Sequence, residues 1–132
     1  MILLDTHVLL WLWEGSRRLG AGARLEIDRA WRDGEVCVSA FSFWEVSMLR
    51  AKGRIRAPEE IERWRREQIE QGLVEVAVDG EIGIRAANLP DFVADPADRL
   101  IVATALEGHR LVTADRHLLD WPGPLQRLDA VR

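Results

Sequence analysis

The sequence predicts an α/β fold: a three-layer α/β/α sandwich with a mainly parallel central sheet, in one domain spanning residues 1–132. Short apolar runs of strand length alternate with longer segments of helical periodicity, and glycines and prolines fall at the boundaries between them. Strands that alternate with helices form a parallel sheet covered by helices on both faces. A chain of 132 residues buries one core but not two, which agrees with a single domain.

Four apolar runs are too short for helices and are bounded by turn or capping residues, so each is predicted to be a strand. These runs are 2–4, 36–40, 73–78 and 111–113. An edge strand is predicted within 124–131, because its proline excludes a central place in the sheet. The only cysteine, Cys37, lies between two valines, so we expect a buried structural thiol and a reducing compartment.

Helical patterns occupy the segments between these strands. Residues 8–13 follow the first strand, and the same period continues through 23–31 to a glycine, which predicts the first crossover. After the second strand, Phe41, Trp44 and Met48 are expected to line one apolar helical face. The remaining helices are predicted from Pro58 to Gly72, from Asp79 to about Leu89, and from Asp95 to Gly108.

The charge balance limits the class of function. A formal net charge of −4 argues against binding nucleic acid by the overall field, so any such binding must be local. A basic cluster suited to phosphate contacts lies at Arg50, Lys52, Arg54 and Arg56, although a solvated helix end explains it equally well. No apolar run reaches membrane-spanning length and no secretory leader precedes the first strand, so we expect a soluble cytoplasmic protein without membrane contact.

Acidic residues gather at one predicted edge of the sheet. Ligands of parallel sheets bind outside the carboxyl ends of the strands. Asp5 ends the first strand, Asp115 follows the fourth, and Asp98 lies in the first turn of the helix that leads to the fourth. Glu45 lies one turn into the helix after the second strand, where we expect it to be half-buried. Grouped carboxylates repel one another unless a cation lies among them, and oxygen ligands favour Mg²⁺ or Mn²⁺ over zinc.

A carboxylate-held magnesium open to water is suited to phosphodiester hydrolysis. Serine or cysteine catalysis is not supported, because no serine lies in a nucleophile-elbow sequence and Cys37 has no histidine close in sequence. No phosphate-binding glycine loop is present either. Each acid also has a structural explanation: Asp5, Asp95 and Asp115 as helix N-caps, Asp98 as a first-turn acid that favours the helix dipole, and Glu45 as a surface charge. A silent module that binds RNA or protein therefore stays open as an alternative. An aspartyl-phosphate phosphohydrolase is a weaker alternative, because such enzymes typically have a second aspartate two residues after the first, and here that position is His7.

Four sequence motifs carry a family resemblance. They are Asp5-Thr6-His7, Val38-Ser39-Ala40 leading to Trp44-Glu45-Val46-Ser47, Asp95-Pro96-Ala97-Asp98-Arg99 before Leu100–Ala105, and Leu111-Val112-Thr113-Ala114-Asp115. Together and in this order, over almost the whole chain, they resemble the PIN-domain VapC toxins of bacterial toxin–antitoxin pairs. At His7 the sequence departs from the commonest pattern, which has asparagine, so the role of that position stays open.

The resemblance implies a Mg²⁺- or Mn²⁺-dependent endoribonuclease whose catalytic acids are Asp5, Glu45, Asp98 and Asp115. Asp5 and Asp98 are then direct metal ligands, Glu45 orients or activates the attacking water, and Asp115 holds a metal-bound water or a second ion. Residues expected to orient these carboxylates or to contact RNA are Thr6, Ser39, Asp95, Arg99 and Thr113. Arg99 is expected to meet the scissile phosphate or to pair with Asp95.

The same resemblance implies partners. VapC proteins form homodimers and are inhibited by a VapB-type antitoxin whose tail lies across the acidic groove. We expect a structured RNA substrate, such as a tRNA or rRNA, because so small a site reads few nucleotides. The six tryptophans exceed what one small core readily hides, so Trp11, Trp13 or Trp64 is expected at an interface, with burial in the core as the alternative.

Overall fold

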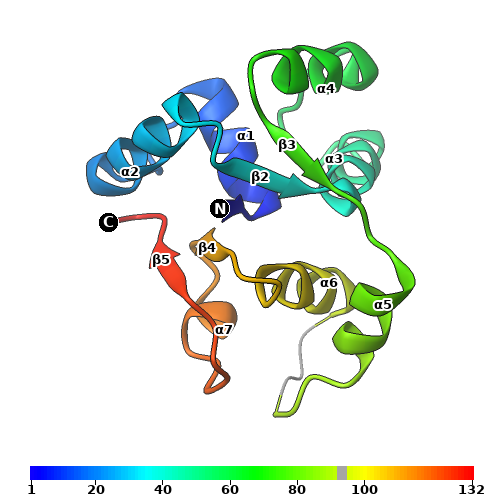
Figure 1. Ribbon diagram of the computed structural model, residues 1–132. Helices are drawn as coiled ribbons and strands as arrows, with labels where there is room; N and C mark the ends of the chain where they lie inside the picture. Colours follow the sequence, from blue (N-terminus) through cyan, green and yellow to red (C-terminus); the bar gives the residue numbers. More distant parts are fainter. Residues whose placement is uncertain (92–94) are drawn as a thin grey trace.

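The computed structural model, described here for residues 1–91 and 95–132, has a five-stranded sheet in the order β3-β2-β1-β4-β5 (Figure 1). The strands are β1 (Ile2–Leu4), β2 (Val36–Ser39), β3 (Val74–Val76), β4 (Arg110–Thr113) and β5 (Arg127–Asp129). Every neighbouring pair is parallel. The chain builds outward from β1, first to β2 and β3 on one side and then to β4 and β5 on the other. The centre of the sheet is therefore a topological switch point, where α/β proteins bind their ligands.

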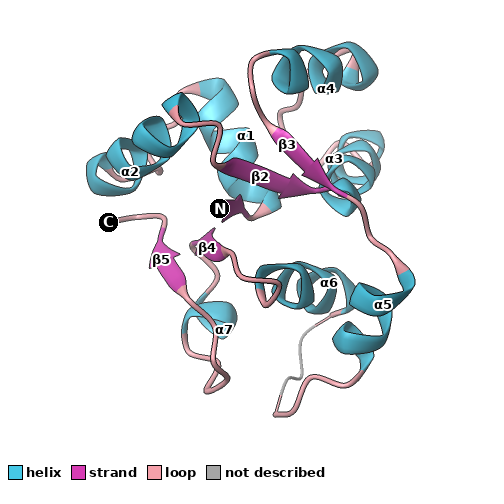
Figure 2. Cartoon of the chain, in the orientation of Figure 1, coloured by secondary structure: helices cyan, strands magenta, loops and turns pink. Residues whose placement is uncertain are grey.

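Helices cover both faces of the sheet, which confirms the predicted α/β/α sandwich (Figure 2). They are α1 (Thr6–Glu14), α2 (Ala21–Arg32), α3 (Ala40–Ala51), α4 (Ile61–Glu70), α5 (Gly80–Ala87), α6 (Pro96–Ala105) and α7 (Arg116–Leu119). Buried side chains of α1 to α4 form a core with one face of the sheet, and those of α6 and α7 pack on the other, with α5 outside α6. No helix in the described ranges is long and apolar enough to cross a membrane.

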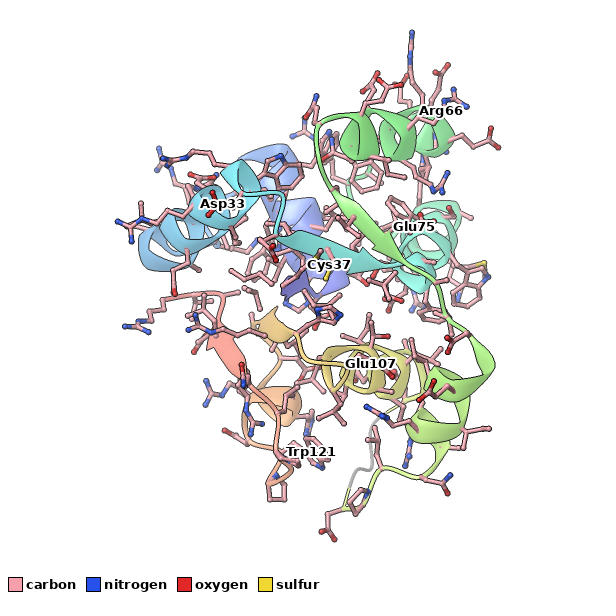
Figure 3. All side chains as sticks on the ribbon, in the orientation of Figure 1. Asp33, Cys37, Arg66, Glu75, Glu107 and Trp121 are labelled. Atoms are coloured by element: carbon pink, nitrogen blue, oxygen red, sulfur yellow. The ribbon has the colours of Figure 1, made fainter. Side chains whose placement is uncertain are left out.

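The strands are buried on both faces, as a central parallel sheet requires. Leu4 and Val38 contribute to the core under α1 to α4, whereas Leu3 and Cys37 contribute to the core under α6 and α7. Figure 3 shows Cys37 in the middle of the fold. Burial raises the pKa of its thiol to about 11, so the group stays protonated at neutral pH. The prediction of a buried structural cysteine is confirmed.

The connection between β1 and β2 contains two separate helices, whereas the sequence pattern continues with one helical period across both. Gly15 ends α1 in a left-handed conformation, with φ of 65°, and its backbone N–H donates to the carbonyl oxygens at the end of the helix. The chain then turns before α2 begins at Ala21. The short helix α7 was not predicted, because four residues are too few to show a helical period. Its position matters for the site, since Asp115 caps it.

The apolar face predicted for α3 is wrong. Ser42, Phe43 and Val46 are the buried residues of this helix, whereas Trp44 is 55% exposed and Met48 38% exposed. The spacing of apolar residues predicted the wrong face because Ser42, a polar residue, occupies a core-facing position. A hydrogen bond to Thr6 satisfies its hydroxyl there.

Trp11, Trp13 or Trp64 was predicted to lie at an interface, and for Trp64 the alternative, burial in the core, is correct. This side chain is only 4% exposed and packs edge-on against Phe43, so it belongs to the core. Trp13 is exposed and Trp11 half-buried, so both stay available to a partner.

Candidate active site

The strand register brings three polar residues to the same edge of the sheet. Leu4 pairs with Val38 of β2 and with Val112 of β4. The next residues along each strand, Asp5, Ser39 and Thr113, therefore lie side by side at the carboxyl edge, all three buried. This is the switch point at which the chain departs in two directions from β1.

Asp5 is held rigidly at the centre of this edge. As the N-cap of α1, its Oδ1 accepts a hydrogen bond from the Thr6 backbone N–H at 2.8 Å. Its Oδ2 accepts from the Thr113 hydroxyl at 2.7 Å. The same hydroxyl oxygen accepts from the Asp115 backbone N–H at 3.0 Å. Thr113 thus fixes the Asp5 carboxylate and ties it to the turn that carries Asp115.

Glu45 enters the site from α3 through a hydroxyl pair. The Thr6 hydroxyl donates to Glu45 Oε1 at 2.5 Å and lies 2.8 Å from the Ser42 hydroxyl. Since Thr6 has a single hydroxyl proton, it donates to the carboxylate and accepts from Ser42. Burial raises the pKa of Glu45, the Thr6 hydrogen bond partly opposes this, and the charges of Asp5 and Asp95 add to the rise. The prediction that Glu45 is half-buried is confirmed.

Asp98 is the most strongly perturbed acid of the cluster. It lies in the first turn of α6, where its backbone N–H donates to Asp95 Oδ1 at 3.0 Å. Desolvation, followed in order of size by the charges of Asp95, Asp115, Asp5 and Glu45, raises the pKa of Asp98 to about 7. The four predicted catalytic acids therefore lie close enough together to act on one another.

His7 and Asp115 complete the edge. Asp115 caps α7, accepting from the His117 backbone N–H at 2.9 Å. His7 Nε2 accepts from the Ala114 backbone N–H at 3.0 Å, so the ring proton of the neutral imidazole is on Nδ1. That nitrogen lies 3.7 Å from Asp5 Oδ2. His7 therefore links the start of α1 to the turn after β4.

The residues expected to support the acids divide into two groups. Thr6 and Thr113 contact carboxylates of the cluster, and Asp95 caps the helix that carries Asp98. The Ser39 hydroxyl instead caps α3, accepting from the Phe41 backbone N–H. Arg99 donates to the Ala86 carbonyl and so links α6 to α5.

The contribution of Ser42 was not predicted, and the role of His7 was left open. Ser42 lies one helical turn before Glu45, and His7 two residues after Asp5. Both residues lie close in the sequence to predicted site residues, and this proximity could have indicated that they contribute to the site. The hydrogen bonds that they form could not be predicted from a serine or a histidine alone.

The donor chemistry of this cluster fits a hard divalent cation. It consists of carboxylate oxygens, and the one nearby imidazole already uses Nε2 to accept a backbone N–H. Over residues 1–91 and 95–132, no group of three or more acids, histidines or cysteines is placed to hold a metal ion. An ion that keeps several waters needs fewer protein ligands than that, and it would relieve the repulsion that acts on Asp98. These features suit Mg²⁺ or Mn²⁺ and not a structural zinc.

A parallel sandwich with carboxylates at its switch point is the PIN-like α/β class of fold. The sequence matches the PIN domain over residues 2–123. It is 38% identical over 119 residues to ribonuclease VapC22 from Mycobacterium tuberculosis, covering 89% of this chain and 88% of that protein. The chain therefore belongs to the PIN domain family and, within it, to the VapC ribonucleases.

Solved structures have the same fold. DNA-bound VapBC from Salmonella typhimurium matches with a TM-score of 0.70 at 18% identity, covering 98% of both chains. VapBC2 from Rickettsia felis, bound to a promoter DNA fragment, matches with a TM-score of 0.69 at 14% identity, covering 97% of this chain and 98% of that one. A toxin–antitoxin complex from Klebsiella pneumoniae matches with a TM-score of 0.68 at 20% identity, covering 98% of both.

Proposed function

We propose that this chain is an endoribonuclease toxin that hydrolyses RNA phosphodiester bonds with Mg²⁺ or Mn²⁺ and is inhibited by a VapB-type antitoxin. The observation that carries the proposal is the meeting of four carboxylates at the switch point, where burial and the charges of the neighbouring acids raise the pKa of Asp98. Such a cluster is unfavourable without a cation and suits phosphoryl chemistry with one.

Each acid then has a role. Asp5 and Asp98 would hold the ion, with Asp115 beside them through a water or a second ion, and the ion would neutralise charge on the phosphate oxygens. Thr113 and the Thr6 backbone N–H keep the Asp5 carboxylate in one orientation. Glu45 has one oxygen engaged by Thr6, which leaves the other to accept a proton from the attacking water. The raised pKa of Glu45 makes it a better base at neutral pH.

An antitoxin partner has a suitable surface on α3. Trp44 and Met48 are exposed there, and the Trp44 ring packs against Phe41 with centroids 5.0 Å apart. Beside Trp44 is a cavity of about 690 Å³ between α3 and α4, with apolar Ile61 and charged Arg65 in its lining. An aromatic group beside a cavity with a polar rim is typical of a protein interface. We propose that this surface binds the antitoxin.

The homodimer also stays a proposal. The exposed Trp13, which contacts Trp64 edge-on, is a candidate for its interface.

A silent binding module is the second candidate, because one observation favours it. Asp5, Asp95 and Asp115 each cap a helix with their own side chain. Three of the five acids therefore have a structural role without any metal. Neither Glu45 nor Asp98 caps a helix with its side chain, and only Asp98, in the first turn of α6, favours a helix dipole. These two acids therefore distinguish the two candidates best.

The experiment is cleavage of total RNA by antitoxin-free protein with Mg²⁺, with Mn²⁺ and with chelator. Asp98→Asn should abolish the metal-dependent cuts. Asp28→Asn, which removes the same charge from an exposed position on α2, should leave them unchanged. No cleavage by the wild-type protein under any of these conditions would favour the binding module. Equal cleavage by the wild type and Asp98→Asn would contradict the assignment of the site.

A further inference from the structure

A second pocket adjoins the acidic site. It lies between α1 and the segment that joins α3 to α4, and it has a volume of about 300 Å³. His7 and Trp11 line it from α1, and Arg54 and Arg56 line it from the other side. His7 also connects the pocket to the acids, because its Nδ1 lies 3.7 Å from Asp5 Oδ2. A substrate whose reacting bond lies at Asp5 can therefore extend past His7 into this pocket.

One wall of the pocket is built from flat groups. The guanidinium carbon of Arg18 lies 5.0 Å from the centroid of the Trp11 ring, and the His7 ring lies 5.0 Å from Trp11 at an interplanar angle of 59°. Trp11 packs against the main core, which fixes its position, and Glu14 pairs with Arg18 at 3.2 Å. Indole faces and guanidinium planes are the surfaces on which nucleobases stack.

The opposite wall carries uncompensated positive charge. Arg54 and Arg56 are exposed, and among the residues that the structure describes neither forms an ion pair. Arg18, by contrast, is neutralised by Glu14. Because the protein is acidic overall and the adjoining carboxylates repel phosphate, an RNA strand needs such local cations to approach. Arginine also matches the bidentate geometry of phosphate.

We propose that this pocket binds the nucleotide adjacent to the scissile phosphate of an RNA strand, with its base on the Arg18 guanidinium, which lies over the Trp11 ring, and its phosphate on Arg54 and Arg56. The proposal rests on the proposed ribonuclease function and adds a substrate-positioning site to it. A base paired inside a duplex cannot enter such a pocket, so the enzyme selects an unpaired nucleotide at this position. An acidic peptide would use the arginines but leave the flat wall unused, and the structure therefore favours RNA.

The phosphate contacts are tested by binding in chelator, which prevents metal-dependent cleavage. The probe is a short fluorescent single-stranded RNA of mixed sequence, followed by anisotropy over a range of salt. The double variant Arg54→Gln/Arg56→Gln should raise Kd about tenfold and reduce the salt slope by about 1.4, since each phosphate contact on a single strand contributes about 0.7.

The matched control is Arg29→Gln/Arg32→Gln, which removes the same charge from exposed positions on α2. These residues lie near the end of α2, which precedes the start of β2 at the opposite edge of the sheet. This control should bind as the wild type does. Equal weakening in both double variants would overturn the proposal, because it would show a general field effect and no localised contact.

The base contact is tested with an abasic strand of the same length. The wild-type protein should bind this strand several-fold more weakly than the complete RNA, and Arg18→Gln should reduce that preference while keeping the thermal stability. Equal binding of both strands by the wild type would overturn the base site. Trp11→Leu is a second variant, used only if its thermal unfolding matches the wild type, because Trp11 contacts the core.

Two further readouts separate this inference from the proposed function. If the wild type cleaves RNA with metal and the Arg54/Arg56 variant keeps its KM, the pocket assignment fails while the ribonuclease stands. If the wild type neither cleaves nor binds any RNA, the proposed function fails as well. Binding of an acidic antitoxin peptide that depends on Arg54 and Arg56, with RNA binding unchanged, would assign the pocket to the antitoxin and overturn the proposal.

Discussion

At the scale of single residues, the site is a set of carboxylates whose charge the surrounding hydroxyls and backbone groups only partly stabilise. Asp5 has hydrogen bonds to both oxygens, whereas Asp98 is half-buried and acted on by four other carboxylates. The sequence was sufficient to predict that these acids gather at one edge of the sheet, because each follows a strand or lies near a helix start, whereas their catalytic roles stay a prediction. The roles of Ser42 and His7 depend on contacts between α1 and α3 and between α1 and β4, which local patterns do not reveal.

Replacing Asp98 by asparagine should stabilise the metal-free protein at neutral pH. The native pKa of about 7 lies above the ordinary value of 3.8, so the native state holds the proton more tightly than the unfolded chain. The resulting loss of stability develops as pH rises from about 4 to about 7 and is complete above that range. Allowing for partial exposure of the side chain, we expect a gain on the order of 1 kcal/mol at pH 8, or about 3 °C in Tm.

The measurement is thermal unfolding of both proteins in chelator at several pH values. The difference between them should become small near pH 4 and vanish by about pH 3, where Asp98 is protonated in both the native state and the unfolded chain. A difference that does not vary with pH would contradict the electrostatic explanation.

Thr113→Val should impair both stability and cleavage. Valine has nearly the same shape but leaves the buried Asp5 Oδ2 and the Asp115 N–H without the hydroxyl that joins them. An unpaired buried polar group costs about 1–3 kcal/mol, and the freed Asp5 carboxylate should lower cleavage about tenfold or more. Thr113→Ser keeps the hydroxyl and should restore most of the activity. Chemical denaturation and a cleavage time course measure the two effects, and full activity in Thr113→Val would mean that Asp5 needs no such support.

At the scale of helices and strands, most elements were predictable because their periods are clear and their ends carry capping residues. Asp79 and Asp95 both cap helices as predicted. The order of the strands was not predictable, because the direction in which each crossover returns to the sheet is set by packing. The wrong face for α3 has a similar cause: Ser42 occupies a core position only because Thr6 supplies a hydrogen-bond partner.

Two glycines, Gly15 at the end of α1 and Gly83 inside α5, should respond to alanine substitution in opposite directions. Gly15 has φ of 65° with open space around it, so Gly15→Ala should cost about 1 kcal/mol through backbone strain alone. Gly83 lies inside α5, also with open space where a Cβ would be, so Gly83→Ala should stabilise by about 0.5–1 kcal/mol. Urea denaturation of the two variants gives both values. A gain in Gly15→Ala would mean that the turn tolerates another conformation.

At the scale of the whole molecule, opposite charges are separated on one surface. The acidic edge at the switch point is flanked by the arginines of the α3–α4 segment, although the net charge is −4. Under the proposed function, a polyanion is thus attracted to one side of the site while its scissile phosphate would depend on a bound cation. Composition alone indicated only that nucleic-acid binding must be local. The separation appears when the fold places His7 both beside Asp5 and in the lining of a pocket with Arg54 and Arg56.

The surface proposed for the antitoxin lies on α3 beyond this acidic edge, so partner binding and catalysis should be separable by mutation. Trp44→Ser removes the exposed indole without changing charge, and an aromatic anchor of an interface contributes about 2 kcal/mol, so antitoxin affinity should fall at least tenfold. Ile84→Ser on α5 is the matched control, because it removes an exposed apolar side chain from the other face of the sheet. Titration calorimetry with the antitoxin and RNA cleavage by each antitoxin-free variant are the two measurements. Unchanged cleavage with weakened antitoxin binding in Trp44→Ser alone is expected, whereas equal affinities in the two variants would place the antitoxin on another surface.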